Sequence, residues 1–188
     1  GPVPAMTLSA RIQTLTNDGS GGWALFDKAR AMISSGTQVT ELTIGEHDRR
    51  TDPRILDAMH KSALSGHTGY ASVPGVSELR KAVSQRVQAR TGVPTTVDNV
   101  LITPGGQAGL FAAHMAVGDP GERALYIDPY YATYPGTIRG AGLIDVPFKT
   151  RARDGFLPNK TALMRECVGA CSLLINSLNN PSGGVYHK

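Results

Sequence analysis

Residues 122–148 read "ERALYIDPYYATYPGTIRGAGLIDVPF", and this stretch decides the fold. The apolar run Ala124–Ile127 predicts a buried strand that ends at Asp128 and Pro129. A short helix is expected next, with Pro135 near its start, and a second strand follows in "LIDVPF". Two strands joined through a helix favour a right-handed crossover, which makes the strands parallel.

The same alternation extends in both directions along the chain. Upstream, helices are predicted for "WALFDKARAMISSG", for "TDPRILDAMHKSALSG" with Asp52 as N-cap, and for "VSELRKAVSQRVQARTG". Strands are predicted in "TQVTELTIGEHD" and in "NVLITPGG", which precedes the apolar helix "QAGLFAAHMAV". Downstream, a helix in "TALMRECVGA" leads to a strand in "CSLLINS". The predicted fold class is α/β, a three-layer α/β/α arrangement with a mainly parallel sheet.

Composition excludes several classes of protein. Of the 188 residues, 40% are hydrophobic and 18% charged, which suits a globular chain with a real core. The net charge of +4 is scattered, so no nucleic-acid partner is expected, and no apolar run approaches a membrane span. Cys167 and Cys171 are interpreted as small core residues with nothing nearby to complete a metal site, and so few cysteines suit the cytoplasm. The opening "GPVPAM" is interpreted as a tag scar before Met6.

Three polar clusters follow predicted strands at the edge where parallel sheets bind ligands. In "ITPGGQAGL", glycines 105 and 106 lead into a helix at Gln107, which favours an anion such as phosphate, although a plain tight turn fits equally. In "DPYYATYP", two tyrosines follow the strand, and a ring there can stack on a flat ligand or pack locally at the surface. In "NSLNNPSGG", amides can bond a ligand oxygen or cap their own turn.

Together with "LTIGEHD" and "GYASVPGVSELRKAV", these clusters strongly resemble class I/II aminotransferases, which are pyridoxal-phosphate enzymes of fold type I. The similarity extends from about Leu42 to the last residue, with five motifs in order. It implies an enzyme that moves an amino group from an amino acid to a 2-oxo acid. The aspartate-aminotransferase-like branch matches best.

The resemblance implies a role for each motif residue. Gly105, Gly106 and Gln107 match the turn that binds the phosphate of pyridoxal 5'-phosphate, and Tyr131 matches the aromatic residue stacked on its ring. Asn180 matches the asparagine that bonds the phenolic oxygen and lies near the substrate carboxylate, where Gly45 is also expected. Tyr70 matches a tyrosine that reaches the phosphate in the neighbouring subunit, which implies a homodimer with a shared active site.

The resemblance also divides the chain. Residues 1–48 would hold the scar, an arm and part of a small domain, and residues 49–188 the first half of the large cofactor-binding domain. Family members are about twice as long. The Schiff-base lysine, the acid that pairs with the pyridine nitrogen and an arginine for the substrate carboxylate are expected beyond residue 188. None of the lysines has the serine-rich context of that anchor: Lys28, Lys61, Lys81, Lys149, Lys160 and Lys188.

Two alternatives remain open at this stage. A pyridoxal-phosphate lyase or synthase of the same fold would share these first-half motifs. A non-catalytic pyridoxal-phosphate sensor module would share them too, although such modules usually follow a winged-helix DNA-binding domain. About forty residues precede the first motif, without an additional basic helical unit.

Overall fold

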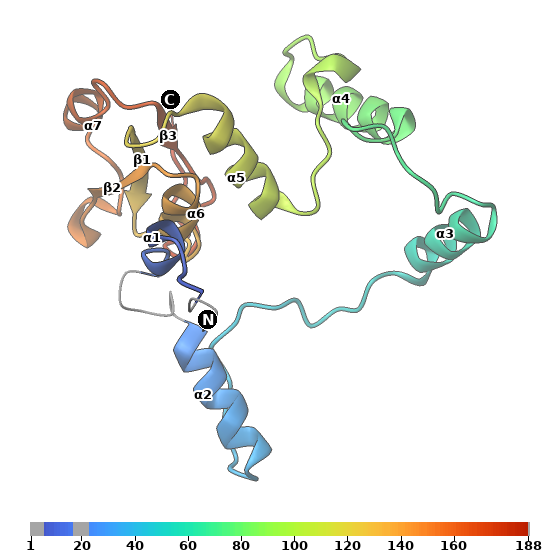
Figure 1. The fold of residues 1–188 in the computed structure, drawn as a ribbon, viewed down its shortest axis with the longest axis horizontal. Coiled ribbons are helices and arrows are strands. Elements are labelled where there is room, and N and C mark those ends of the chain that lie inside the picture. Colours follow the sequence, from blue (N-terminus) through green and yellow to red (C-terminus); the bar gives the residue numbers. More distant parts are fainter. Residues whose placement is uncertain (1–5, 17–22, 188) are drawn as a thin grey trace, which may run out of the picture. The chain divides into compact units, whose positions relative to one another are not determined.

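The structure is a computed structural model that describes residues 6–16 and 23–187. The chain forms two compact units, one of residues Gly1–Val39 with Gly105–Lys188 and one of Thr40–Pro104. Figure 1 shows the elements of both. The predicted scar at residues 1–5 lies outside the described residues, and so does residue 188.

A three-stranded parallel sheet is the centre of the first unit (Figure 1). Its order is β2-β1-β3, with β1 at Arg123–Asp128, β2 at Ile144–Lys149 and β3 at Ser172–Leu174. The central strand β1 is buried from Ala124 to Ile127. Because both faces of a central parallel strand are covered, its sequence is an uninterrupted apolar run instead of an alternating one.

Helices accompany this sheet in the order expected of crossover units. Helix α5 spans Gly106–Val117 before β1, α6 spans Tyr134–Gly140 between β1 and β2, and α7 spans Lys160–Glu166 before β3. A 3₁₀ turn, η2, occupies Ala152–Asp154. The first unit also contains α1 at Ala10–Gln13 and α2 at Trp23–Ser34.

The core of the first unit lies where β1 meets α6. Ala124 and Tyr126 point to the same face of β1 because side chains alternate along a strand. They pack with Tyr134 and Ile138 of α6, and Leu110 of α5 contacts the same cluster. Residues of β1, α5 and α6 therefore share one core, and the tyrosine loop begins where β1 ends.

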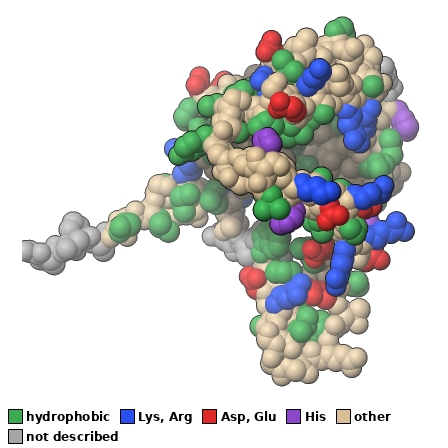
Figure 2. Space-filling model, turned by 90° about the vertical axis from the view of Figure 1, so that its right-hand side faces the viewer, with side chains coloured by type: hydrophobic (Ala, Val, Ile, Leu, Met, Phe, Trp, Pro, Cys, Tyr) green, Lys and Arg blue, Asp and Glu red, His purple; other side chains and the backbone are tan. Residues whose placement is uncertain are grey.

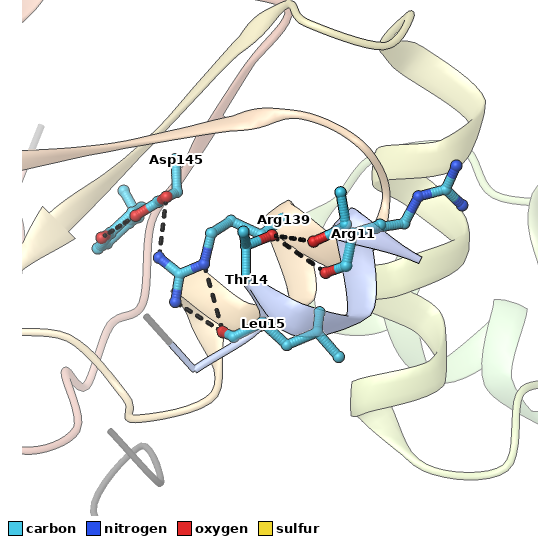
Figure 3. A network of polar contacts seen from close by, with 7 residues as sticks. Arg11, Thr14, Leu15, Arg139 and Asp145 are labelled. Carbon is cyan, nitrogen blue, oxygen red and sulfur yellow. Dashed lines mark hydrogen bonds and ion pairs between the residues drawn. The ribbon is translucent and has the colours of Figure 1, made fainter. Parts of the chain in front are cut away.

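A buried ion pair fixes the far end of α6 (Figure 3). Arg139 contacts Asp145 of β2 at 3.0 Å, and both side chains are more than four-fifths buried. The same guanidinium donates to the carbonyl oxygen of Leu15, at 2.7 Å from Nη2. The Leu15 side chain lies beside Gly140, where an added Cβ would approach it to 3.2 Å. Arg139 thus joins the N-terminal segment, α6 and the sheet.

Tyr126 completes this network and gives it a pH dependence. Its hydroxyl donates to Asp145 at 3.0 Å, and burial together with that carboxylate raises the pKa of Tyr126 well above its usual range. Above the ordinary tyrosine pKa of about 10, the unfolded chain releases this proton while the folded chain keeps it. The folded state then binds more protons than the unfolded state, so stability falls as pH rises.

We therefore expect Tyr126→Phe to lose less stability than the wild type on going from about pH 8 to about pH 11. Urea midpoints of the two proteins at both pH values provide the measurement. Other titrating groups act equally in both proteins, so the difference between them isolates Tyr126. Parallel pH profiles would show that this hydroxyl is not linked to folding.

The second unit consists of two helices and a short turn. Helix α3 spans Pro53–Leu64, and its N-cap Asp52 accepts from the backbone of Arg54 at 2.9 Å, as the sequence predicted. Helix α4 spans Ser77–Thr91 and ends at Gly92, which takes a left-handed conformation. The 3₁₀ turn η1 at Val97–Asn99 packs on α4.

Two expected strands are not formed. Residues 37–48 and 99–104 contain no β-strand, and Leu101 is 60% exposed. A parallel strand needs a neighbour to receive its hydrogen bonds, and the described residues offer none to these segments.

Apolar side chains of α3 such as Ile55 and Met59 are also exposed, and Figure 2 shows apolar side chains open on the surface beside charged ones. In the part of the chain that is described, no helix is long and apolar enough to cross a membrane.

Candidate cofactor site

The loop that follows β1 is held from both sides. On one side, the amide nitrogen of Asn179 donates to the carbonyl oxygen of Pro129 at 3.1 Å. On the other, the hydroxyl of Thr133 donates to Oε1 of Gln107 at 2.7 Å. Tyr131 lies between these two attachments. The glycine turn, the tyrosine loop and the amide turn are therefore linked beside the end of β1, although the strand expected before Gly105 does not form.

The start of α5 is suited to an anion. Gly105 is the N-cap with a φ of +83° and makes no side-chain cap, and the first backbone bond of the helix runs from Gly109 to Gly105 at 3.4 Å. The backbone N–H groups of residues 106–108 thus have no partner within the helix. Apart from its chain neighbours and the backbone of α5, an added Cβ at Gly105 or Gly106 would meet no atom within 4 Å, so there is space beside the turn.

Asn176 and Asn179 brace the amide turn. Asn179 is 5% exposed, and its amide also donates to the hydroxyl of Ser182 at 2.7 Å. Its backbone closes the turn through bonds with Gly183 and Gly184 at 2.7 and 2.9 Å. The side-chain oxygen of Asn176 accepts from the backbone of Asn180 at 2.8 Å. These bonds fix the backbone on which Asn180 stands.

Asn180 is exposed, and its side-chain amide takes part in no hydrogen bond among those of the described residues. It therefore differs from Asn179, whose amide nitrogen donates to both Pro129 and Ser182. An amide side chain carries two donors and one acceptor oxygen. Asn180 thus has both side-chain donors left for a ligand and is exposed at the surface.

Tyr131 is 39% exposed and meets the ring of Tyr134 edge-on, at 5.7 Å between centroids. Tyr134 belongs to the core, and burial raises the pKa of its hydroxyl, with a smaller contribution from Tyr131. One ring is thus fixed in the core and supports the other at the surface. An edge-to-face contact leaves a face of Tyr131 available for stacking.

Tyr70 and Gly45 belong to the second unit, where Tyr70 is fully exposed. The structure describes them with that unit alone, so their roles at the site stay predictions.

The sequence analysis did not select Thr133, the N-cap of α6, or Thr137 within this helix. Thr137 is buried and accepts from the amide nitrogen of Gln107, and its own hydroxyl donates to the carbonyl oxygen of Thr133 at 2.8 Å. The spacing of four residues places both hydroxyls on one helical face, which was the available signal. Their partner on α5 is visible only once the fold brings the two helices into contact.

Comparison with known proteins decides the family. Residues 37–188 match the model of aminotransferase class I and II. The chain belongs to this family. Aminotransferases of this family depend on pyridoxal phosphate.

Relatives with known names support the assignment. The chain is 32% identical to the aspartate/prephenate aminotransferase of Thermus thermophilus over 182 residues, which are 96% of the chain and 47% of the relative. It is 30% identical to the arginine–pyruvate transaminase AruH of Pseudomonas aeruginosa, covering 95% of the chain and 46% of AruH. The chain therefore spans about half the length of the curated relatives it matches.

Solved aminotransferase structures confirm the predicted fold class. The aspartate aminotransferase of Thermus thermophilus with maleate superposes with a TM-score of 0.90 at 32% identity, over 97% of this chain and 48% of that one. The alanine aminotransferase of Pyrococcus furiosus gives 0.88 at 26% identity, over 97% and 47%. Both are similar to this chain across nearly its whole length.

Proposed function

We propose that this chain supplies the cofactor-holding half of an aminotransferase that moves an amino group from an amino acid to a 2-oxo acid. One observation carries the proposal. The loop from Pro129 to Thr133 is tied to the amide turn at one end and to the glycine turn at the other. Three motifs of a family that uses pyridoxal phosphate thereby share one edge of the sheet.

The residues fit pyridoxal phosphate in each of its parts. The open turn at Gly105 and Gly106, with the backbone of Gln107, matches a phosphate dianion at a helix N-terminus. The half-exposed ring of Tyr131 matches the flat pyridine ring. The uncommitted amide of Asn180 matches the phenolic oxygen.

The bound cofactor supplies an electron sink that makes the proton on the amino acid's Cα acidic. The chain's own residues hold and orient. Helix α5 holds the dianion, and Tyr131 fixes the plane of the ring. A hydrogen bond from Asn180 stabilises the negative form of the phenolic oxygen, which lowers its pKa. Asn180 and Gly45 are also assigned to the neighbourhood of the substrate carboxylate. We assign the covalent anchor and base to none of the lysines of this chain.

The assembly forms part of the same proposal. We place Tyr70 at the phosphate of a partner subunit in a homodimer, and its fully exposed side chain supports a role outside its own unit. We also propose that residues 1–48 form a scar, an arm and part of a small domain, and residues 49–188 the first half of the large domain. A cytoplasmic location is supported by two free cysteines. Neither nucleic acid nor membrane is proposed as a partner.

Amino transfer by the protein at its full natural length tests the proposal. Relatives are named for aspartate, prephenate, arginine and pyruvate, so the donors to try first are aspartate and arginine. Each is incubated with pyridoxal phosphate and with prephenate, pyruvate or 2-oxoglutarate, and the new amino and oxo acids are quantified. Cofactor binding without transfer from any common donor would favour a lyase or a sensor. Absence of cofactor binding would end the proposal.

Tyr131→Ala is expected to weaken pyridoxal phosphate binding about 10-fold, because the loss of a stacked ring removes both its contact and its buried area. Tyr131→Phe keeps the ring and should bind within about 2-fold of the wild type. Titration of the apo-protein with the cofactor, followed by its visible absorption, gives both affinities. Equal weakening in the two variants would place the effect on the hydroxyl instead of the ring.

A further inference from the structure

The side chain of Gln107 is turned away from the anion turn and toward α6. Its Oε1 accepts from Thr133 at 2.7 Å, and its Nε2 donates to Thr137. The hydroxyl of Thr137 in turn donates to the carbonyl oxygen of Thr133 at 2.8 Å. Both ends of the amide are therefore engaged within the protein.

These bonds connect the two places where one ligand would be held. Gln107 is the second residue of α5, so its backbone belongs to the anion turn. Thr133 lies two residues after Tyr131, at the end of the loop that carries the ring. The hydrogen bonds of Gln107 with Thr133 and Thr137, called the bridge below, thus join the α5 turn, where a phosphate would bind, to the loop of Tyr131, where a ring would stack. A planar amide held by two hydroxyls sets the distance between them more narrowly than apolar contact would.

We infer that Gln107 is a positioning residue, whose side chain acts through Thr133 and Thr137 to set the spacing between the α5 turn and Tyr131. This inference rests on the proposed function, because it presupposes a ligand with a phosphate at one end and a flat ring at the other. It adds that the side chain of Gln107 is not itself a phosphate ligand. Ligands that touch both ends need the bridge, and ligands that touch one end do not.

Two probes separate these cases, namely pyridoxal phosphate, which spans the site, and inorganic phosphate, which occupies the α5 turn alone. Isothermal titration of the full-length apo-protein measures both. Thr133→Val removes the hydroxyl at nearly constant shape. It should weaken pyridoxal phosphate binding about 3- to 10-fold, as the loss of one neutral hydrogen bond implies. Inorganic phosphate should bind it within about 2-fold of the wild type.

Matched variants complete the design. Thr133→Ser keeps the hydroxyl and should restore cofactor affinity. Gln107→Met removes both bonds. Adding Thr133→Val to this variant should weaken pyridoxal phosphate binding little further, because the effects of substitutions in residues that act as one unit are not additive. Thermal melts of the apo-proteins identify any variant that fails to fold. If Thr133→Val does not fold, the cofactor affinity of Thr133→Ser is compared with that of the wild type.

Equal weakening of both probes in Gln107→Met would overturn the inference, since it would make the side chain a phosphate ligand. Unchanged cofactor affinity in Thr133→Val would overturn it as well. A wild-type protein that binds no pyridoxal phosphate would instead contradict the proposed function on which the inference rests.

Discussion

Asn179→Ala is expected to lose about 3 kcal/mol of folding stability and most of the activity of the full-length protein. The change removes two side-chain hydrogen bonds and leaves the carbonyl oxygen of Pro129 without its donor at a partly buried position. It also frees the turn that orients Asn180, and a shift of about 1 Å in a positioning group can cost about 100-fold in rate. Urea unfolding and steady-state kinetics measure the two effects.

Two further substitutions separate the lost hydrogen bond to Pro129 from the loss of order around Asn180. Asn179→Asp keeps the shape but presents an oxygen to the Pro129 carbonyl in place of the donor, so it should resemble Asn179→Ala. Asn176→Ala removes a single acceptor, that of the Asn180 backbone, and should cost about 1 kcal/mol. Wild-type activity in Asn179→Ala would contradict the idea that this side chain links the amide turn to the tyrosine loop.

Asp145→Ala should cost about 3 kcal/mol of stability, the lower part of the range for breaking a buried ion pair. The substitution leaves the guanidinium of Arg139 and the hydroxyl of Tyr126 without their shared acceptor, in a region where the two charged side chains are 16% and 18% exposed. Urea denaturation of the full-length protein gives the free energy of unfolding directly.

An exposed pair in the same unit provides the control. Arg151 and Asp154 are 67% and 50% exposed and approach to 3.3 Å. Asp154→Ala should change stability by less than about 1 kcal/mol, because water screens such a pair. If Asp145→Ala and Asp154→Ala cost the same, burial of the Arg139 pair contributes nothing to the fold.

Local signals were sufficient to predict most elements. Asp52 followed by Pro53 marked the start of α3, and Gly92 marked the end of α4. The apolar run at Ala124–Ile127 identified the buried central strand. The strands expected at 37–48 and 99–106 did not form, because a strand depends on a neighbour and sequence alone does not show where that neighbour comes from.

Motifs select the residues of the candidate site, whereas the contacts between these residues could not be predicted from the sequence. Gly105, Tyr131 and Asn180 could be selected because each follows a predicted strand in a recognisable context. The bridge from Gln107 to Thr133 spans 26 residues, and that from Asn179 to Pro129 spans 50. Such partners are chosen by the packing of α5, α6 and the sheet, which no local pattern encodes.

The contact between Leu15 and Arg139 has a consequence for the order of synthesis. The two residues are 124 positions apart, so the N-terminal segment emerges from the ribosome long before α6 exists. At about 5–20 residues per second, it waits about 6–25 s for its guanidinium partner. During that interval Leu15 is accessible to chaperones and proteases, and this accessibility ends when the segment packs on α6.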